Sequence, residues 1–211
     1  MLNRRLFLTF VGSFAGAVAL LPDQTFAAED DDEFEAGART FIEHLADDAL
    51  VSLTQSGLET DQRRERFRQL MHQYFAFNVI AKWVLGRYWR RASDPQRKEY
   101  LALFEKLMVI TYADRFEKYA GEKLKIQKTE VRAEKDALVH SVLQRPDGQK
   151  AVAVVWRVRP KDDSYKVVDV MVEGLSMGIT QQKEFSSVIR QHDNKVEGLL
   201  DELRKRVKVD T

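Results

Sequence analysis

Apolar residues recur with helical spacing through the first half of the chain. They return at steps of three and four residues over 41–53 and again over 60–75, which predicts two amphipathic helices. A third helix is expected over about 79–84, and Gly86 should mark its end or a kink. The stretch SDPQRKEYLALFEKLMVITYADRFEKY (93–119) predicts the longest helix of the chain, with a large and aromatic apolar stripe.

After Gly121 the spacing changes from helical to alternating. The alternation predicts four strands, over 123–131, 136–145, 151–159 and 164–173. Short turns join them, so they should form an antiparallel meander. Gly174 should end the sheet, and two further helices should follow it. We therefore predict an α+β fold with N-terminal helices, a curved antiparallel four-stranded meander and C-terminal helices, similar to the NTF2/cystatin-like cone that encloses an apolar pocket.

The first 27 residues, MLNRRLFLTFVGSFAGAVALLPDQTFA, are typical of a signal peptide. They combine two adjacent arginines, an apolar run over 6–21 and small residues before a cut after Ala27. The arginine pair also fits a twin-arginine signal, so export by that route or by the general route stays open. The apolar run is shorter than the roughly 20 residues of a membrane span. We expect residues 1–27 to be removed, and residues 28–211 to form one exported domain without a stable membrane anchor.

Composition excludes several classes of function. The predicted signal peptide holds two arginines and one aspartate, so its removal from a chain with 34 basic and 33 acidic residues leaves 32 of each. This neutral balance argues against a nucleic-acid partner, which would require a basic face. The chain has no cysteine, which excludes disulfides, thiol catalysis and zinc-thiolate sites. No metal site is expected either, because the histidines lie on separate predicted elements: His44, His72, His140 and His192.

No familiar catalytic motif is present in the sequence. There is neither a glycine-rich phosphate loop nor a Gly-x-Ser-x-Gly elbow. Ser176, in EGLSMG, lies between the last predicted strand and the next helix, so it should form a turn or start the helix rather than act as a nucleophile.

Asp169 is the sharper candidate for chemistry, because it lies inside an apolar strand. If it faces inward it would be a carboxylate in an apolar cup, with a raised pKa that suits a general base. The inner face of that strand would then hold Tyr165, Val167, Asp169 and Met171. A buried unpaired charge is costly, so we favour an ion pair instead. Its candidate partners are Arg87, Arg90 and Arg157.

The segment LGRYWRRAS (85–93) places two large rings among three arginines. We expect Tyr88 and Trp89 to pack as core at a corner after the third helix. The arginines should lie over these rings or reach acidic partners, which gives them a structural or partner-facing role. They are Arg87, Arg90 and Arg91.

Two blocks, VLGRYWRRASDPQRKEYLALFEKLMVITYADRFEKYAGEKL and YKVVDVMVEGLSM, resemble the MlaC, or toluene-tolerance Ttg2D, family of periplasmic phospholipid-binding proteins. The resemblance covers about 41–203. The closing QQKEFSSVIRQHDNKVEGLLDEL is similar to the hopanoid-associated branch called HpnM, although it differs from that branch at Lys183 and at Asp193-Asn194.

The resemblance implies a periplasmic lipid carrier rather than an enzyme. Such a protein holds the acyl chains of a phospholipid and carries it between an outer-membrane lipoprotein complex and an inner-membrane ABC lipid transporter complex. The lipid is cargo, and no cofactor is implied. Three alternatives stay open: hopanoid-associated lipid transport, an NTF2-like enzyme on an apolar substrate with Asp169 as base, and a protein-interaction module.

A carrier of this kind needs a dry cavity, since burial of each methylene contributes about 0.8 kcal/mol. Two chains of roughly 16 carbons would gain on the order of 20 kcal/mol before costs. From the helices we expect the lipid to contact Phe75, Val79, Leu103, Phe104, Leu107 and Met108. From the sheet we expect Val152, Val154, Trp156, Val167 and Met171. Pocket and core use the same residue types, so these positions are also those of an ordinary core.

Overall fold

The computed structural model describes residues 25–119, 121–132, 136–146 and 148–209. Most of the predicted signal peptide, residues 1–24, therefore lies outside the described residues. The helices are α1 (Thr25–Leu53), α2 (Thr60–Tyr74), α3 (Phe77–Leu85), α4 (Asp94–Ala113), α5 (Met177–Gln191) and α6 (Val196–Val209), with short 3-10 helices η1 (Gly86–Arg90) and η2 (Asp114–Lys118). The strands are β1 (Lys123–Arg132), β2 (Asp136–Gln144), β3 (Val152–Lys161), β4 (Ser164–Val172) and β5 (Leu175–Ser176). The predicted α+β class is confirmed.

The helices differ from prediction mainly in length. Helix α1 has 29 residues and α4 has 20, so the expectation that α4 would be the longest is wrong. The segment 93–119, predicted as one helix, is α-helical only as far as Ala113 and continues as the 3-10 helix η2. Helix α1 instead extends backward to Thr25, through the acidic stretch EDDDEFE (29–35) that lies before the predicted helix. None of the helices within the described ranges is long and apolar enough to cross a membrane.

Local signals explain where α3 and α4 begin and end. Gly86 follows α3 with φ +59°, a backbone conformation that favours glycine, and its amide donates to the carbonyl of Lys82. Ser93 caps α4, because its hydroxyl accepts a hydrogen bond from the amide of Gln96 while the Gln96 side chain accepts from the Ser93 amide. The predicted end of the third helix at Gly86 is confirmed.

The sheet is an antiparallel meander in the order β1-β2-β3-β4-β5. It has one strand more than predicted, because the chain turns at Glu173 and Gly174 and pairs once more before α5. A register shift between Arg157 and Val158 gives β4 one extra residue relative to β3. Such a bulge changes which face the following side chains occupy. After the bulge, Val170 and Val172 of β4 pair with residues of β3 that face the helices. Asp169 and Met171 pair with residues of β3 on the opposite face of the sheet.

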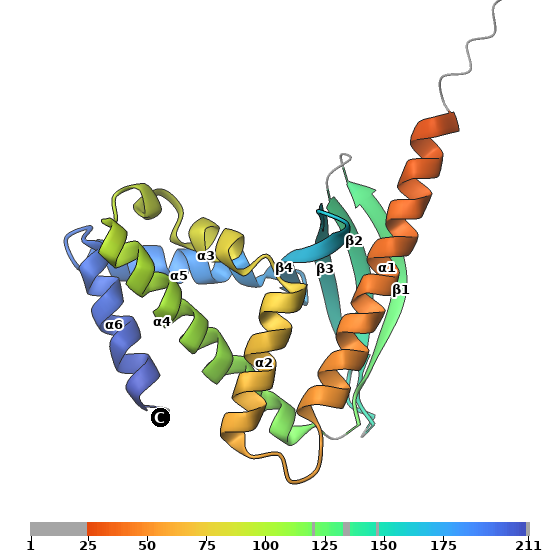
Figure 1. Ribbon diagram of the computed structural model, residues 1–211, viewed down its shortest axis with the longest axis horizontal. Coiled ribbons are helices and arrows are strands. Elements are labelled where there is room, and N and C mark those ends of the chain that lie inside the picture. The colour runs from red at the N-terminus through yellow and green to blue at the C-terminus, as the bar shows by residue number, and fades with distance from the viewer. Residues whose placement is uncertain (1–24, 120, 133–135, 147, 210–211) are drawn as a thin grey trace, which may run out of the picture.

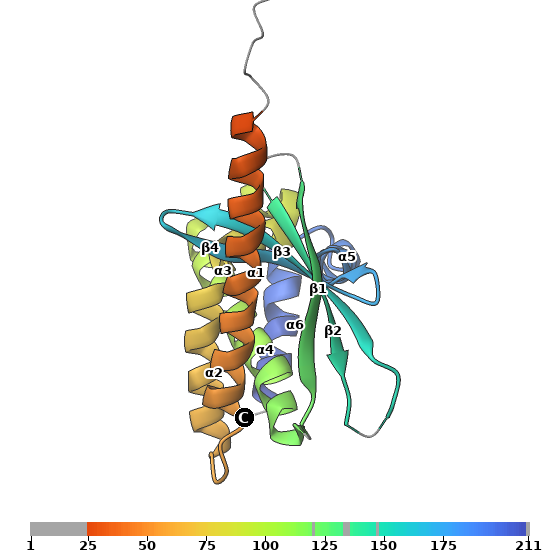
Figure 2. The ribbon, with the colours of Figure 1, turned by 90° about the vertical axis from the view of Figure 1, so that its right-hand side faces the viewer.

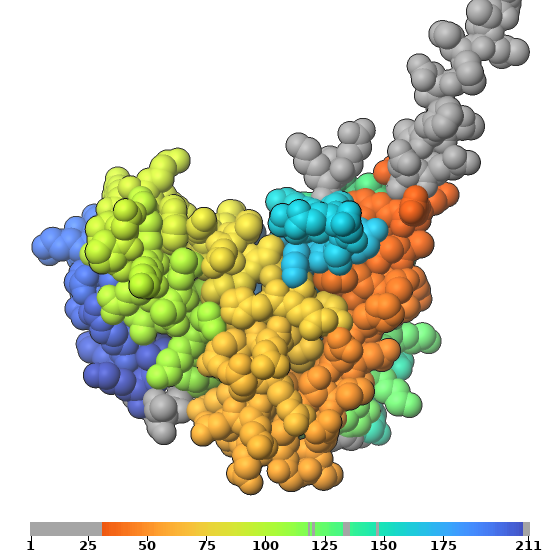
Figure 3. Space-filling view, in the orientation of Figure 1, coloured from red at the N-terminus to blue at the C-terminus, as the bar shows by residue number. Residues whose placement is uncertain are grey.

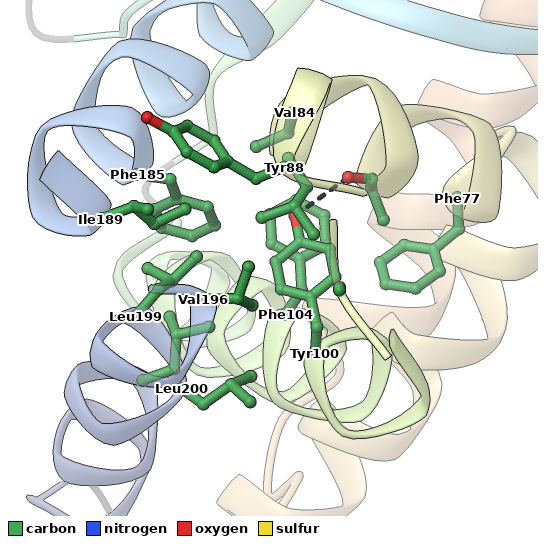
Figure 4. Packing of buried hydrophobic residues seen from close by; sticks show 14 of the residues in the cluster. Phe77, Val84, Tyr88, Tyr100, Phe104, Phe185, Ile189, Val196, Leu199 and Leu200 are labelled. Atoms are coloured by element: carbon green, nitrogen blue, oxygen red, sulfur yellow. Dashed lines mark hydrogen bonds between the residues drawn. The ribbon is translucent and has the colours of Figure 1, made fainter. Parts of the chain in front are cut away.

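Two hydrophobic cores stabilise the molecule. One lies among η1 and the helices α3, α4, α5 and α6, and the other lies among α1, α2 and the inner face of the sheet. Figure 1 shows the first group of helices on one side of the molecule, with the sheet and α1 on the other and α2 between them. Figure 2 shows α1 running along the sheet, where it contacts β1, β2 and β3. Figure 4 shows the helical core, whose centre is the aromatic group of Tyr100, Phe104 and Phe185.

The corner at η1 is built as the sequence suggested. Tyr88 is 1% exposed, and its hydroxyl donates to the side-chain oxygen of Asn194. The guanidinium groups of Arg87 and Arg91 lie over the Tyr88 ring at 5.1 and 5.7 Å from its centre. Arg90 is exposed as well. Within the described residues none of the three arginines forms an ion pair with a carboxylate. The alternative prediction, that these arginines reach acidic partners, is therefore wrong.

Candidate functional site

An apolar cavity of about 560 Å³ lies between the two cores. Its volume falls in the range of about 300–1,000 Å³ that is typical of ligand pockets. Helices contribute most of the lining: Leu45, Ala46, Ala49, Leu50, Leu53, Phe67, Leu70, Met71, Phe77, Ile80, Val84, Phe104, Met108, Tyr112, Arg115 and Phe116, followed by Met177, Gly178 and Gln181 of α5. The α2–α3 junction, the η2–β1 connection and the sheet add Phe75, Tyr119, Glu122, Leu124, Leu143, Val154, Trp156, Asp169, Val170 and Val172. Figure 3 shows α1 and α2 as a continuous surface over the front of this part of the molecule.

The cavity exists because neighbouring elements are held at its edges without filling it. The α2–α3 junction is fixed to β4, since the amide of Ala76 donates to the carbonyl of Val167 at 2.9 Å. Helix α1 faces the cavity with two small side chains, Ala46 and Ala49, among larger ones. At α5, Gly178 allows a close approach, because a Cβ there would lie 2.6 Å from the Trp83 ring. These contacts leave apolar side chains lining an empty space.

The structure brings five of the predicted contact residues to the cavity wall. They are Phe75, Phe104, Met108, Val154 and Trp156. On α4 the lining positions are Phe104, Met108 and Tyr112, at steps of four residues, as expected for one helix face. On β3 the lining positions alternate, as expected for one face of a sheet. Contact of these five with a lipid stays a prediction.

Three helical residues of the predicted set do not line the cavity. On α3 the cavity side is formed by Phe77, Ile80 and Val84, whereas Val79 lies on the opposite side and is 54% exposed. Leu103 and Leu107 precede the lining residues of α4 by one position, which turns them by about 100° toward the helical core, where they pack partly buried.

Three sheet residues of the set also lie outside the lining. Val167 is fully buried in the core beneath α1 and α2. Met171 is carried to the outer face by the bulge, so placing it on the inner face was wrong. Val152 sits at the start of β3, opposite Leu143, which lines the cavity in its place.

Sequence reasoning missed the contributions of α1 and of the segment after α4. Ala46 and Ala49 of α1 give no strong apolar signal in the sequence. Because their side chains are small and lie three positions apart on an apolar helix face, they leave room for a cavity. Arg115 and Phe116 were assigned to the end of a long helix, although they belong to η2 at the cavity rim. No motif in the sequence predicts a ligand-binding role for Arg115.

Asp169 is held by three hydrogen bonds rather than by an arginine. Its carboxylate accepts from the Ser176 hydroxyl at 2.6 Å, from the Gly178 amide at 3.2 Å and from its own neighbour, the Val170 amide, at 2.9 Å. The favoured ion pair with Arg87, Arg90 or Arg157 was therefore wrong. The physical reason is that the carboxylate of Asp169, on β4, lies against the first turn of α5. The free amides and the positive end of that helix stabilise an anion.

Arg157 has a different acidic partner. It shares Asp136 with Arg159, and both guanidinium groups donate to that carboxylate at 2.6 Å. Burial alone would raise the pKa of Asp136, but the hydrogen bonds from Arg159 and Arg157 outweigh burial and hold the pKa below its ordinary value. This network lies at the start of β2 and holds Arg157 away from Asp169.

The hydroxyl of Ser176 is already engaged at the start of α5. The Ser176 hydroxyl donates to Asp169 and accepts from the Ile179 amide at 3.0 Å, so it caps α5 as expected. Across the ranges that the structure describes, no group of three histidine, cysteine or acidic residues could hold a metal ion. The arrangement suits the enclosure of an apolar ligand.

Comparison with known proteins gives two matches. The family model of the MlaC protein matches residues 43–205. A solved structure of the phospholipid-binding protein from Ralstonia solanacearum, determined in complex with a phospholipid, superposes with a TM-score of 0.73. That protein is 23% identical to this chain, and the match covers 81% of this chain and 97% of the other. At this identity the second match shows the fold.

Proposed function

Because the chain belongs to the MlaC protein family, we propose that it is a lipid carrier of the periplasm, which holds the acyl chains of a phospholipid in the cavity between its two cores. The observation that carries the proposal is the cavity itself, which is lined almost entirely by apolar side chains. The phospholipid in the similar structure from Ralstonia solanacearum supports the same class of ligand. The energetic reason is the transfer of acyl methylenes out of water, at about 0.8 kcal/mol each.

The proposal extends to the route of the cargo. The carrier would move phospholipid between an outer-membrane lipoprotein complex and an inner-membrane ABC lipid transporter complex, and so maintain the lipid asymmetry of the outer membrane. Residues 1–27 would act as the export signal, and residues 28–211 would be the single lipid-binding domain. No cofactor takes part in this scheme.

Native mass spectrometry of the mature protein, followed by organic extraction, tests the proposal directly. We expect a stoichiometric adduct whose mass and extract identify a phospholipid. A hopanoid in the extract would instead support the hopanoid-associated alternative. A folded protein that is empty and takes up no added lipid would contradict the carrier function.

Replacing Asp169 with asparagine separates the carrier from the enzyme alternative. We expect the Asp169→Asn protein to keep its lipid but to lose about 1–2 kcal/mol of stability, because the amide cannot replace the charged acceptor at α5. Thermal unfolding and lipid stoichiometry measure the two effects. Ser176→Ala is the matched control, since it removes one donor to the same carboxylate. Loss of turnover on an added apolar substrate, with binding intact, would favour the enzyme.

Arg87 and Arg90 of η1, with Arg91 directly after it, are our candidates for contact with the membrane complexes. They are exposed and unpaired with carboxylates among the described residues, and they lie next to α3, whose Val79 and Trp83 are 54% and 43% exposed. Exposed apolar side chains beside cations are typical of an interaction surface.

Reversing these charges should therefore slow delivery without emptying the carrier. We expect the Arg87→Glu, Arg90→Glu, Arg91→Glu protein to hold its lipid and to transfer it at least several-fold more slowly to membranes that contain the transporter complex. Fluorescent lipid transfer measures the rate. Lys205→Glu, on the exposed face of α6, is the control. An unchanged transfer rate would place the contact surface elsewhere.

A further inference from the structure

Arg115 is the only cation in the lining of the cavity, as far as the described residues show. It lies in η2, and its residue is exposed to solvent. A residue that both lines a cavity and reaches solvent marks a place where the cavity opens. The cavity therefore meets water beside a positive charge.

Both acidic residues of η2 lie against arginines of α2. Asp114 accepts two hydrogen bonds from Arg64 of α2, at 3.2 and 2.9 Å. Glu117 lies 3.9 Å from the buried Arg63 of the same helix. These ion pairs fasten η2 to α2 and fix the rim of the cavity. Arg115 itself has no carboxylate partner among the described residues.

Arg115 is held in place by an aromatic ring instead. Its guanidinium lies 5.1 Å from the centre of the Tyr112 ring, one helical turn earlier, and Tyr112 also lines the cavity. Stacking leaves the edge of the guanidinium free to donate hydrogen bonds. Two N–H groups on that edge match two oxygens of a phosphate, which a guanidinium binds in a bidentate manner.

We propose that Arg115 binds the phosphodiester of the cargo lipid, at the point where the head group leaves the cavity. This inference rests on the proposed function, since it assumes that the acyl chains fill the cavity. The chains must be buried while the charged phosphate stays near water, and Arg115 is the cation at that boundary. Glu122, a carboxylate, also lines the cavity, and Tyr119 donates to its carbonyl at 2.9 Å. Phosphatidylethanolamine, whose head group carries a phosphodiester, is the probe.

The test compares two lipids that share acyl chains, of which only one carries a phosphoethanolamine head group. Delipidated wild-type and Arg115→Gln proteins are offered phosphatidylethanolamine and diacylglycerol in competition, and native mass spectrometry reports the occupancy of each. We expect the wild type to prefer the phospholipid, and Arg115→Gln to lower that preference by about tenfold while diacylglycerol binding is unchanged. Arg115→Lys should recover part of the preference, because lysine keeps the positive charge but lacks the paired N–H donors of a guanidinium. Arg190→Gln is the matched control, since Arg190 is an exposed arginine of α5 that lies outside the lining.

Three outcomes would contradict the assignment, and they can be told apart. An unchanged preference in Arg115→Gln would remove Arg115 from head-group recognition and leave the carrier function intact. An equal loss of both lipids in Arg115→Gln would show that Arg115 shapes the cavity rather than binding phosphate. A wild-type protein that takes up neither lipid would overturn the carrier function, and this inference with it.

Discussion

Replacing Ala49 with tryptophan should empty the cavity of lipid. Ala49 lines the cavity from α1, next to Leu45 and Leu53, so an indole at this position would occupy space that the acyl chains need. We expect the Ala49→Trp protein to co-purify with at least tenfold less lipid than the wild type. Filling a cavity with an apolar side chain commonly stabilises a protein, so its melting temperature should be equal or higher. Lipid extraction and thermal unfolding of the same preparation measure both effects.

Val51→Trp provides a control on the same helix. Val51 is 67% exposed, only two residues from Ala49, so the same side chain would be added outside the cavity. Its lipid content should match that of the wild type. Full lipid occupancy in Ala49→Trp would show that the acyl chains lie elsewhere. A fall in both lipid content and melting temperature would instead indicate that the indole disrupts packing between α1 and the sheet.

The periodicity of apolar residues was enough to predict most elements of the fold. Helical spacing located parts of α1 and α3, together with α2 and α4, and alternation located β1 to β4, because burial on one face imposes a period on the sequence. The short strand β5 was missed, since two residues after a tight turn carry no pattern. The start of α1 was missed because its acidic residues form a helix without an apolar stripe.

The inward face of β4 could not be read from the sequence. The run VVDVMV (167–172) is apolar at almost every position, so either face of the strand could be buried. The bulge that decides the question depends on pairing with β3 and leaves no trace in β4 itself. For the same reason the partner of Asp169 was not predictable. Arg157 lies across from it in the sheet, yet its guanidinium is bound to Asp136 at the start of β2.

The helical core should depend most strongly on Tyr100. The residue is fully buried, its ring is stacked on Phe104 with 5.7 Å between ring centres, and it meets Phe185 edge-on at 6.2 Å. Its hydroxyl donates to the carbonyl of Ala81 at 2.9 Å, and burial raises the pKa of this phenol well above its ordinary value. Tyr100→Ala would remove these contacts and leave a cavity, at a cost of about 3–5 kcal/mol. For a chain of this size that loss corresponds to a fall in melting temperature of about 10 °C or more.

Tyr100→Phe separates ring packing from the hydrogen bond. It keeps the ring but leaves the buried Ala81 carbonyl without its donor, which should cost about 1–2 kcal/mol. Because Phe104 also lines the cavity, Tyr100→Ala should loosen one wall and lower the retention of any lipid held there, whereas Tyr100→Phe should not. Thermal unfolding with lipid analysis measures both variants. Equal destabilisation by the two substitutions would mean that the hydroxyl, and not the aromatic packing, holds α3 against α4.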